Sequence, residues 1–198
     1  HQALAEVDAA LAASGRSALA RSTARLMARD NAGREAALAA IVDAEASHGR
    51  LDDARTTFEK MIPGPARDAA ASALASALAM DGDSAAALAL ADAIEDEEAL
   101  AWALASVVAA GDTAQLDRIP WGEARDMALS SVSLSEMQAG NTNQALEAAR
   151  AIADVESRAI ALQLIAQELS GGRATMIAAE IDHPEVRASI MADAAETT

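Results

Sequence analysis

The stretch AGNTNQALEAARAIAD, residues 139–154, contains the signals that decide the fold. Gly140 and Asn141 stand directly before a run rich in alanine, the residue with the highest helix propensity. Nearly the same pattern occurs in AMDGDSAAALALADAIED, residues 79–96. A glycine that ends one helix, followed by an Asp or Asn that begins the next, is typical of a helix–turn–helix unit. We therefore interpret the two stretches as copies of one repeated unit.

Glycines extend this pattern along the chain. Their successive spacings are 34, 33, 29, 29 and 32 residues, for Gly15, Gly49, Gly82, Gly111, Gly140 and Gly172. The residues five and nine positions after each glycine are apolar core formers in every copy except at Pro120. Because these two offsets lie on one face of a helix, each glycine is predicted to precede a short helix with one apolar stripe.

A second helix is predicted upstream of most of these glycines. It begins with Arg, often followed by an acidic residue, and continues with alanine and leucine; copies start at Arg34, Arg67, Arg125, Arg158 and Arg187. One helix pair of this size cannot bury its apolar stripe alone, whereas stacked pairs bury a continuous core. The predicted fold class is all-α, a right-handed α-solenoid of about six helix–turn–helix repeats plus a C-terminal capping helix.

The predicted layout is a single helical repeat domain over residues 1–198. Its repeats lie near 1–31, 32–64, 65–95, 96–121, 122–154 and 155–183, with a cap at 184–198. Thirteen helices are expected near 2–13, 17–29, 33–47, 51–61, 66–80, 84–94, 97–110, 113–119, 122–138, 142–152, 156–169, 173–181 and 185–195. The eighth is short because proline stops it.

This unit resembles the tetratricopeptide repeat (TPR), a helix–turn–helix motif of 34 residues. The best match is HGRLDDARTTFEKM, residues 48–61, where consensus positions are occupied by Gly49, Leu51, Ala54, Phe58 and Met61. A second match, AGNTNQALEAARAI, has Gly140, Ala145 and Ala149 at such positions. The resemblance covers nearly the whole chain with degenerate repeats, since the early Trp and the Tyr of the family are replaced.

The resemblance implies a non-catalytic protein–protein interaction scaffold or adaptor of a bacterial assembly. In the TPR family the first helix of each pair lines a concave, partner-binding face. Carried over, those positions are Asp43, Ser72, Ser76, Met80, Ala101, Ala105, Met127, Ser130, Leu134, Met137 and Leu162. The alternative is a binder of a small apolar ligand, or an accessory subunit docking on a membrane complex. An open groove would favour the scaffold, and a sealed cavity would favour the ligand binder.

Charge narrows the range of partners. The net charge of −16 opposes binding to nucleic acid or to an anionic membrane surface. Ten acidic residues and no basic residue lie between Arg67 and Arg118. This segment is either a solvated acidic surface or, through Asp92, Glu95 and Asp96, a docking face for a protein with a basic surface or segment.

One basic stripe stands out on the predicted second helix. Arg21, Arg25 and Arg29 are spaced at i, i+4 and i+8, so they share one face. They are expected either to form salt bridges with a neighbouring acidic helix or to contact an acidic partner.

Signals for catalysis, metals and cofactors are absent from the sequence. The chain has no Cys, and His1, His48 and His183 lie in different repeats without ligands at metal-binding spacing. The four carboxylates at 95–98 fall at an inter-helix turn, where they are expected to be exposed, whereas a catalytic acid needs a buried carboxylate. We expect no enzyme activity, no metal and no cofactor.

The fourth repeat is expected to contain a weak junction near residues 113–122. We expect Trp102 and Trp121 to fill the space that the short helix leaves there. If Trp121 is exposed instead, it becomes the best candidate for a binding anchor, since tryptophan is enriched at interface hot spots.

The sequence also gives expectations about compartment. The longest apolar run, residues 99–110, is too short to span a bilayer, so a soluble protein is expected. The chain begins at His1 rather than Met, which favours an exported, periplasmic chain, with a cytoplasmic one as the alternative. The single lysine, Lys60, among basic residues that are otherwise arginine is typical of a GC-rich bacterial genome.

Overall fold

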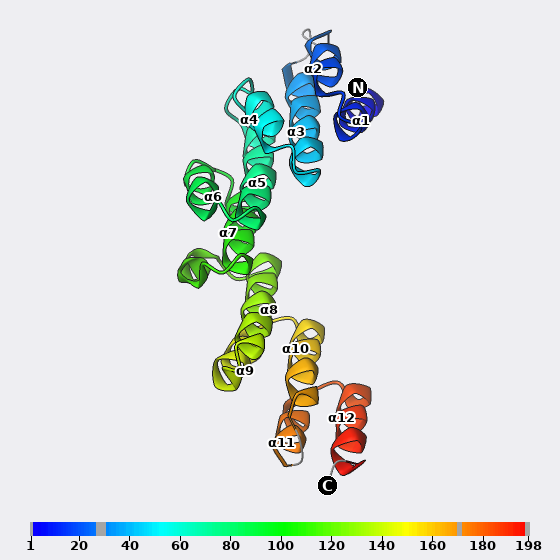
Figure 1. The fold of residues 1–198 in the computed structure, drawn as a ribbon, viewed down its shortest axis with the longest axis vertical. Coiled ribbons are helices and arrows are strands. Elements are labelled where there is room, and N and C mark those ends of the chain that lie inside the picture. The colour runs from blue at the N-terminus through cyan, green and yellow to red at the C-terminus, as the bar shows by residue number, and fades with distance from the viewer. Residues whose placement is uncertain (1, 27–30, 170–171, 197–198) are drawn as a thin grey trace. The chain divides into compact units, whose positions relative to one another are not determined.

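The computed structural model describes residues 2–26, 31–169 and 172–196, and within these ranges it contains helices and no strand (Figure 1). The helices are α1 (Gln2–Ala13), α2 (Ser17–Leu26), α3 (Asn31–Ser47), α4 (Leu51–Phe58), α5 (Pro65–Met80), α6 (Ser84–Ala91), α7 (Glu97–Ala109), the 3-10 helix η1 (Thr113–Arg118), α8 (Glu123–Gln138), α9 (Thr142–Ala151), α10 (Val155–Gln167), α11 (Gly172–Glu180) and α12 (Pro184–Glu196). The predicted all-α class is confirmed, and the predicted helices differ from these by a few residues at their ends. None of the described helices combines the length and apolar character needed to cross a bilayer.

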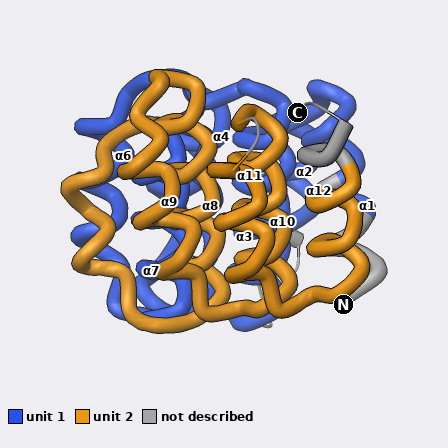
Figure 2. Tube along the Cα trace, turned by 90° about the horizontal axis from the view of Figure 1, so that it is seen from below, with its two compact units in different colours: residues 1–110 blue, residues 111–198 orange. Residues whose placement is uncertain are grey.

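The chain divides into two compact units, His1–Ala110 and Gly111–Thr198 (Figure 2). In the first unit, α3 packs between α1 and α5, α5 also packs on α7, and each short helix packs on the long helix before it. In the second unit, α8 packs on η1 and α9, and α10 contacts α8, α9, α11 and α12. The boundary falls inside the predicted fourth repeat, next to the segment in which a weak junction is expected.

Glycines end the long helices as predicted. Gly49 has a φ of 71°, and the N–H of the next residue, Arg50, donates to the carbonyl of Glu45 at 2.8 Å. This closes the last turn of α3 in the manner of a Schellman motif. A positive φ recurs at Gly15, Gly82, Gly111 and Gly140. The prediction is wrong for Gly172, which is the first residue of α11.

The predicted apolar stripe of the short helices forms the core. Ala54 and Phe58 of α4 are buried, as are Ala145 and Ala149 of α9. The exception is η1, after which Pro120 is exposed and Ile119 is fully buried instead. Because a 3-10 helix has 3.0 residues per turn rather than 3.6, its inward-facing position is shifted relative to an α-helix.

An arginine near the start of α5, α8, α10 and α12 ties each of these four helices to the end of the preceding short helix. The guanidinium of Arg67 donates to the carbonyl of Met61 at 2.6 Å, and that of Arg125 donates to Ile119 at 2.8 Å. The same bond, six residues back along the chain, links Arg158 to Ile152 and Arg187 to Ile181. The repeated arginine therefore satisfies a carbonyl left open where the short helix ends.

The acidic residue beside that arginine accepts hydrogen bonds from the loop that precedes the next long helix. Asp68 accepts from the backbone N–H of Asp96 at 3.0 Å. The buried Asp126 accepts two such bonds, from Ala153 at 2.8 Å and Asp154 at 2.9 Å. Glu35 accepts from Ile62 in the same way. These bonds fix the start of the following long helix.

A shift of 58 residues relates α5–α7 to α8–α10. It carries the N-cap residues of α5 and α7, Gly64 and Asp96, onto those of α8 and α10, Gly122 and Asp154. Each residue of the first segment therefore has a structural counterpart in the second, which allows the surfaces of the two to be compared position by position.

Candidate functional site

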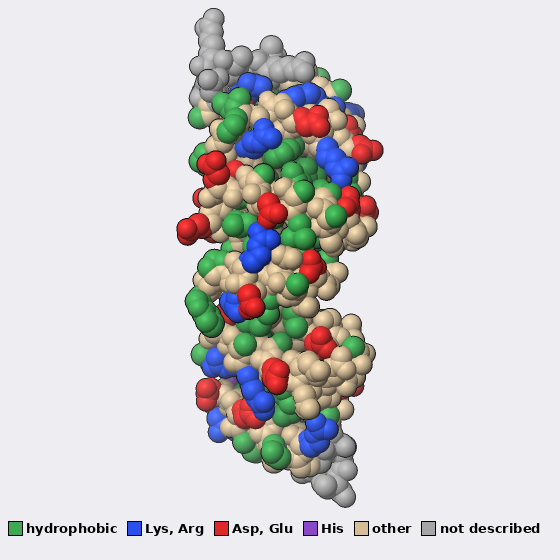
Figure 3. Space-filling view, turned by 90° about the vertical axis from the view of Figure 1, so that its left-hand side faces the viewer, with side chains coloured by type: hydrophobic (Ala, Val, Ile, Leu, Met, Phe, Trp, Pro, Cys, Tyr) green, Lys and Arg blue, Asp and Glu red, His purple; other side chains and the backbone are tan. Residues whose placement is uncertain are grey.

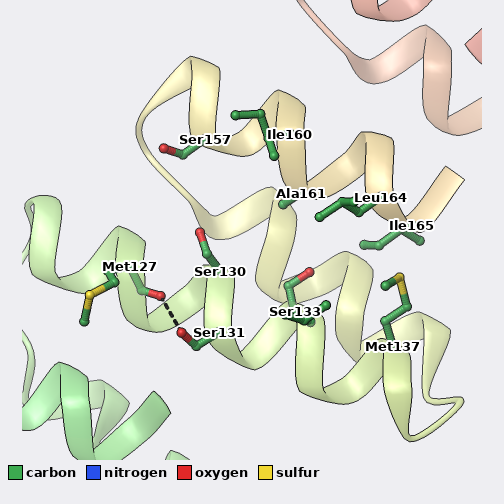
Figure 4. Close-up of a pocket in the computed structure, with 11 residues that line it drawn as sticks. Met127, Ser130, Ser131, Ser133, Met137, Ser157, Ile160, Ala161, Leu164 and Ile165 are labelled. Carbon is green, nitrogen blue, oxygen red and sulfur yellow. Dashed lines mark hydrogen bonds between the residues drawn. The ribbon is translucent and has the colours of Figure 1, made fainter. Parts of the chain in front are cut away.

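A groove of about 320 Å³ lies between α8 and α10 in the second unit (Figure 4). From α8 it is lined by Met127, Ser130, Ser131, Ser133, Leu134 and Met137. From α10 it is lined by Ser157, Ile160, Ala161, Leu164 and Ile165. The lining contains apolar and hydroxyl side chains, and it contains no charged group.

The groove is open to solvent. Leu134 and Leu164 on its walls are each 44% exposed, and Ile160 is 51% exposed. Its floor is formed by the buried residues Ala161 and Ile165. Side chains of this size are usually buried, so their exposure in one groove marks it as a surface that another molecule could cover.

Two of the three α8 serines that line the groove use their hydroxyl protons within the helix. The hydroxyl of Ser130 donates to the carbonyl of Asp126 at 2.9 Å, and that of Ser131 donates to Met127 at 3.1 Å (Figure 4). Both hydroxyl protons are therefore used within α8 itself. The groove can recognise apolar surface well and backbone groups poorly.

One carboxylate is fixed at the end of the groove where α10 begins. Asp154 is the N-cap of α10, and its side chain accepts from the N–H of Ser157 at 2.7 Å. Hydrogen bonds from the Ser157 N–H and then from its hydroxyl lower the pKa of Asp154. Asp154 is therefore ionised at neutral pH, and it adds negative charge beside a lining residue.

The first unit contains the counterpart of this groove, a hollow between α5 and α7. It is lined by Ala69, Ser72, Ala73, Ser76, Asp96, Glu98, Ala99 and Trp102. The 58-residue shift carries Ser72 and Ser76 onto Ser130 and Leu134, which line the groove. The two hollows therefore lie at the same place on two copies of one structure.

They differ at the pair of side chains that face each other across the helices. In the first unit the hydroxyls of Ser76 and Ser106 are hydrogen-bonded at 2.8 Å, and α5 packs on α7 along much of its length. The same shift places Leu134 and Leu164 at these positions in the second unit, where α8 and α10 contact each other far less. Two half-exposed leucines thus replace a small, closed polar contact.

Four of the predicted concave-face residues come together in the groove: Met127, Ser130, Leu134 and Met137. Ser72 and Ser76 line the hollow of the first unit. Asp43 and Met80 are exposed on α3 and α5 and line neither hollow.

Ala101, Ala105 and Leu162 line neither the groove nor the hollow, because all three are buried. The two alanines lie where α7 packs against its neighbours, and small side chains allow helices to approach until no surface remains. On α10 the predicted register is displaced, so that Ile160 and Leu164 face the groove in place of Leu162. Sequence reasoning missed these two residues, although a comparison at a 58-residue offset would have aligned Leu164 with Ser106.

Two of the predicted docking charges, Arg21 and Asp96, have partners within the fold. Arg21 lies 2.9 Å from the buried carboxylate of Glu45 on α3, which agrees with the salt-bridge alternative stated for this stripe. Arg25 and Arg29 lie outside the described side chains. Asp96 accepts from the N–H of Ala99 as the N-cap of α7.

Asp92 and Glu95 are exposed. On the face of the molecule drawn in Figure 3, acidic and basic side chains are interspersed rather than gathered by sign. This mixture is typical of a solvated surface.

Trp121 is 79% exposed, so the prediction that it fills the core is wrong. It stands in the turn before α8, and Ile119 takes the buried position in its place. The guanidinium of Arg125 lies 5.1 Å from the centroid of the Trp121 ring. Trp102 is only half-buried and lines the hollow of the first unit. Trp121 therefore remains a candidate contact residue.

Replacing Trp121 with alanine should lower the free energy of unfolding by less than about 1 kcal/mol, because only an exposed cation–π contact is lost. A buried tryptophan would instead cost about 3–5 kcal/mol. Urea unfolding followed by circular dichroism measures the difference. A loss above about 3 kcal/mol would show that the ring is buried in solution.

The described residues contain no group of three or more His, Asp or Glu side chains that could hold a metal ion. Burial raises the pKa of Asp8. A raised pKa alone does not make a catalytic acid, which also needs a second group placed to act on a substrate.

Comparison of the chain with protein-family models, with curated proteins and with solved structures finds no match. The case for a functional site therefore rests on the geometry of the groove and on its difference from the hollow in the first unit.

Proposed function

We propose that this protein is a non-catalytic interaction scaffold that binds a segment of another protein in the groove between α8 and α10. In this proposal the chain is a right-handed α-solenoid of tetratricopeptide-like repeats, as its glycine spacing predicts. The observation that carries the proposal is the pair of half-exposed leucines, Leu134 and Leu164, at positions where the first unit has hydrogen-bonded serines.

Leucine at these positions is unfavourable for an isolated chain and favourable for a bound one. Contact between apolar surface and water is unfavourable. Burying the exposed halves of Leu134 and Leu164 against a partner would contribute about 2 kcal/mol to the free energy of binding. The methionines at the ends of the α8 stripe, Met127 and Met137, add flexible apolar surface that adapts to different shapes.

An open groove favours a protein segment over a small apolar ligand. Small-molecule sites bury most of the surface of their ligand, which a groove with half-exposed walls does not achieve. A protein segment covers such walls from above, because the rest of the partner excludes the solvent.

The test is affinity purification from the native cell with three forms of the full chain. These are the unchanged protein, a groove variant (Leu134→Ser with Leu164→Ser) and a control (Leu19→Ser with Met176→Ser). The control residues are also apolar and are more exposed, but they lie on α2 and α11. We expect to find proteins that the unchanged form and the control retain and that the groove variant loses.

Identical sets of captured proteins for the groove variant and the control would refute the proposal. Native mass spectrometry of the purified chain tests the alternative. A bound lipid or other small apolar molecule that disappears in the groove variant would favour the ligand binder.

A further inference from the structure

Three carboxylates extend the helical rows that line the groove. All three are exposed, and none of their side chains forms an ion pair or hydrogen bond with another described residue. Side chains four residues apart lie on the same face of a helix. Each carboxylate is therefore one turn from a lining residue: Glu123 from Met127, Glu156 from Ile160 and Glu168 from Leu164.

Glu123, Glu156 and Glu168 form the rim of the groove. The basic side chains of α8 and α10 do not neutralise this negative rim. Arg125 is the only basic residue of α8, and it donates to the carbonyls of Leu116 and Ile119, both at 2.8 Å. Arg158 is the only one of α10, and it donates to Ile152 at 2.9 Å. Neither arginine lines the groove, so we expect the exposed carboxylates beside it to make the potential around its apolar walls negative.

The groove fits a helix better than an extended peptide. An extended backbone needs hydrogen-bond partners along its length, and the described lining has no amide or guanidinium group to supply them. A helix satisfies its own backbone and presents side chains alone. From Met127 to Met137 the groove follows α8 for about 15 Å, at 1.5 Å per residue, which matches about three turns of a second helix.

We infer that the groove binds an amphipathic α-helix of a partner protein, with an apolar stripe on Leu134, Ile160 and Leu164 and with Lys or Arg side chains beside that stripe. The inference rests on the proposed function and names the chemistry of its partner. Charge complementarity selects a basic helix, because an acidic one would bring like charges to the rim.

The hollow of the first unit allows the contribution of negative charge to be separated from that of exposed apolar surface within the same chain. It has carboxylates at Asp96 and Glu98, which the 58-residue shift carries onto Asp154 and Glu156, but its facing pair is serine. Negative charge is therefore present at both places, and the exposed leucines occur only at the groove.

Four synthetic peptides of about 14 residues test the inference, a length at which such a helix is marginally stable alone. The first has leucine at i, i+3, i+4 and i+7 with lysine elsewhere. The second and third replace lysine with glutamine or glutamate, and the fourth scrambles the Leu/Lys order. Fluorescence anisotropy with the full chain measures binding across a salt series.

The Leu/Lys peptide should bind most tightly. The groove variant Leu134→Ser/Leu164→Ser should weaken it about tenfold or more, as loss of two buried contacts does. The rim variant Glu123→Gln/Glu156→Gln/Glu168→Gln should weaken it about threefold to tenfold and flatten its salt dependence. A control with the same charge change in the first unit, Asp81→Asn/Glu95→Gln/Glu97→Gln, should have a smaller effect than the rim variant.

Each other outcome contradicts a defined part of the inference. If the scrambled peptide binds as tightly as the Leu/Lys peptide, or if the control variant weakens binding as much as the rim variant, then net charge alone attracts the peptide. Either result would overturn the inference. Equal binding of the glutamine or glutamate peptide would overturn the basic partner and leave the proposed function standing. If the groove variant Leu134→Ser/Leu164→Ser binds all four peptides as tightly as the unchanged chain does, the inference that a helix binds in the groove is overturned. The purification experiment then tests the proposed function independently.

Discussion

Replacing Arg21 with methionine is expected to lower the free energy of unfolding by about 3–5 kcal/mol, because it leaves a buried carboxylate without its cation. The side chain of Glu45 is fully buried, and the Arg21 guanidinium lies 2.9 Å from its Oε1. The hydroxyl of Thr57 donates to the other oxygen of Glu45 at 2.7 Å. These contacts join α2, α3 and α4, so their loss should destabilise the packing of these three helices in the first unit.

Two further variants identify the cause. Arg55→Met breaks a similar pair with Asp83, 3.4 Å apart, in which both side chains are half-exposed. It should cost less than about 1 kcal/mol. Arg21→Met/Glu45→Met removes both buried charges and should recover most of the loss. Urea unfolding measures all three, and an Arg21→Met effect no larger than that of Arg55→Met would contradict the prediction.

The helices and their apolar stripes could be predicted because their signals are local. A glycine such as Gly49 ends a helix through its own φ, and Ala54 and Phe58 are buried because their spacing places them on one face. Neither inference needs a contact with a distant residue. The register of η1 was not predicted, because no local signal showed that these residues form a 3-10 helix followed by a buried Ile119.

Contacts distant in sequence could not be predicted in the same way. Nothing in the sequence indicates that Arg21 pairs with Glu45, 24 residues further on, since either side chain is equally suited to solvent. Part of the groove lining was expected from the sequence: the α8 residues stand at positions that the resemblance to tetratricopeptide repeats implies, but the α10 wall depends on where that helix begins. Its start is set by Asp126, on another helix.

Asp126→Ala is therefore the second change expected to have a large effect, about 3 kcal/mol in the free energy of unfolding, since it removes two hydrogen bonds to a charged acceptor. Asp126 is buried and accepts from the N–H groups of Ala153 and Asp154 at 2.8 and 2.9 Å. Asp68→Ala is the matched control, because the structure gives that half-buried counterpart one such bond, from Asp96 at 3.0 Å. It should cost about half as much.

Asp126→Ala should also affect the groove, although Asp126 does not line it. The two bonds hold the turn from which α10 starts, and α10 carries Ile160 and Leu164 on one wall. Loss of these bonds should raise amide hydrogen exchange at Ala153 and Asp154 first and weaken binding of the Leu/Lys peptide. Asp68→Ala should leave peptide binding unchanged, because its bond lies in the first unit. Equal loss of peptide binding in both variants would mean that general destabilisation, rather than the position of α10, controls the groove.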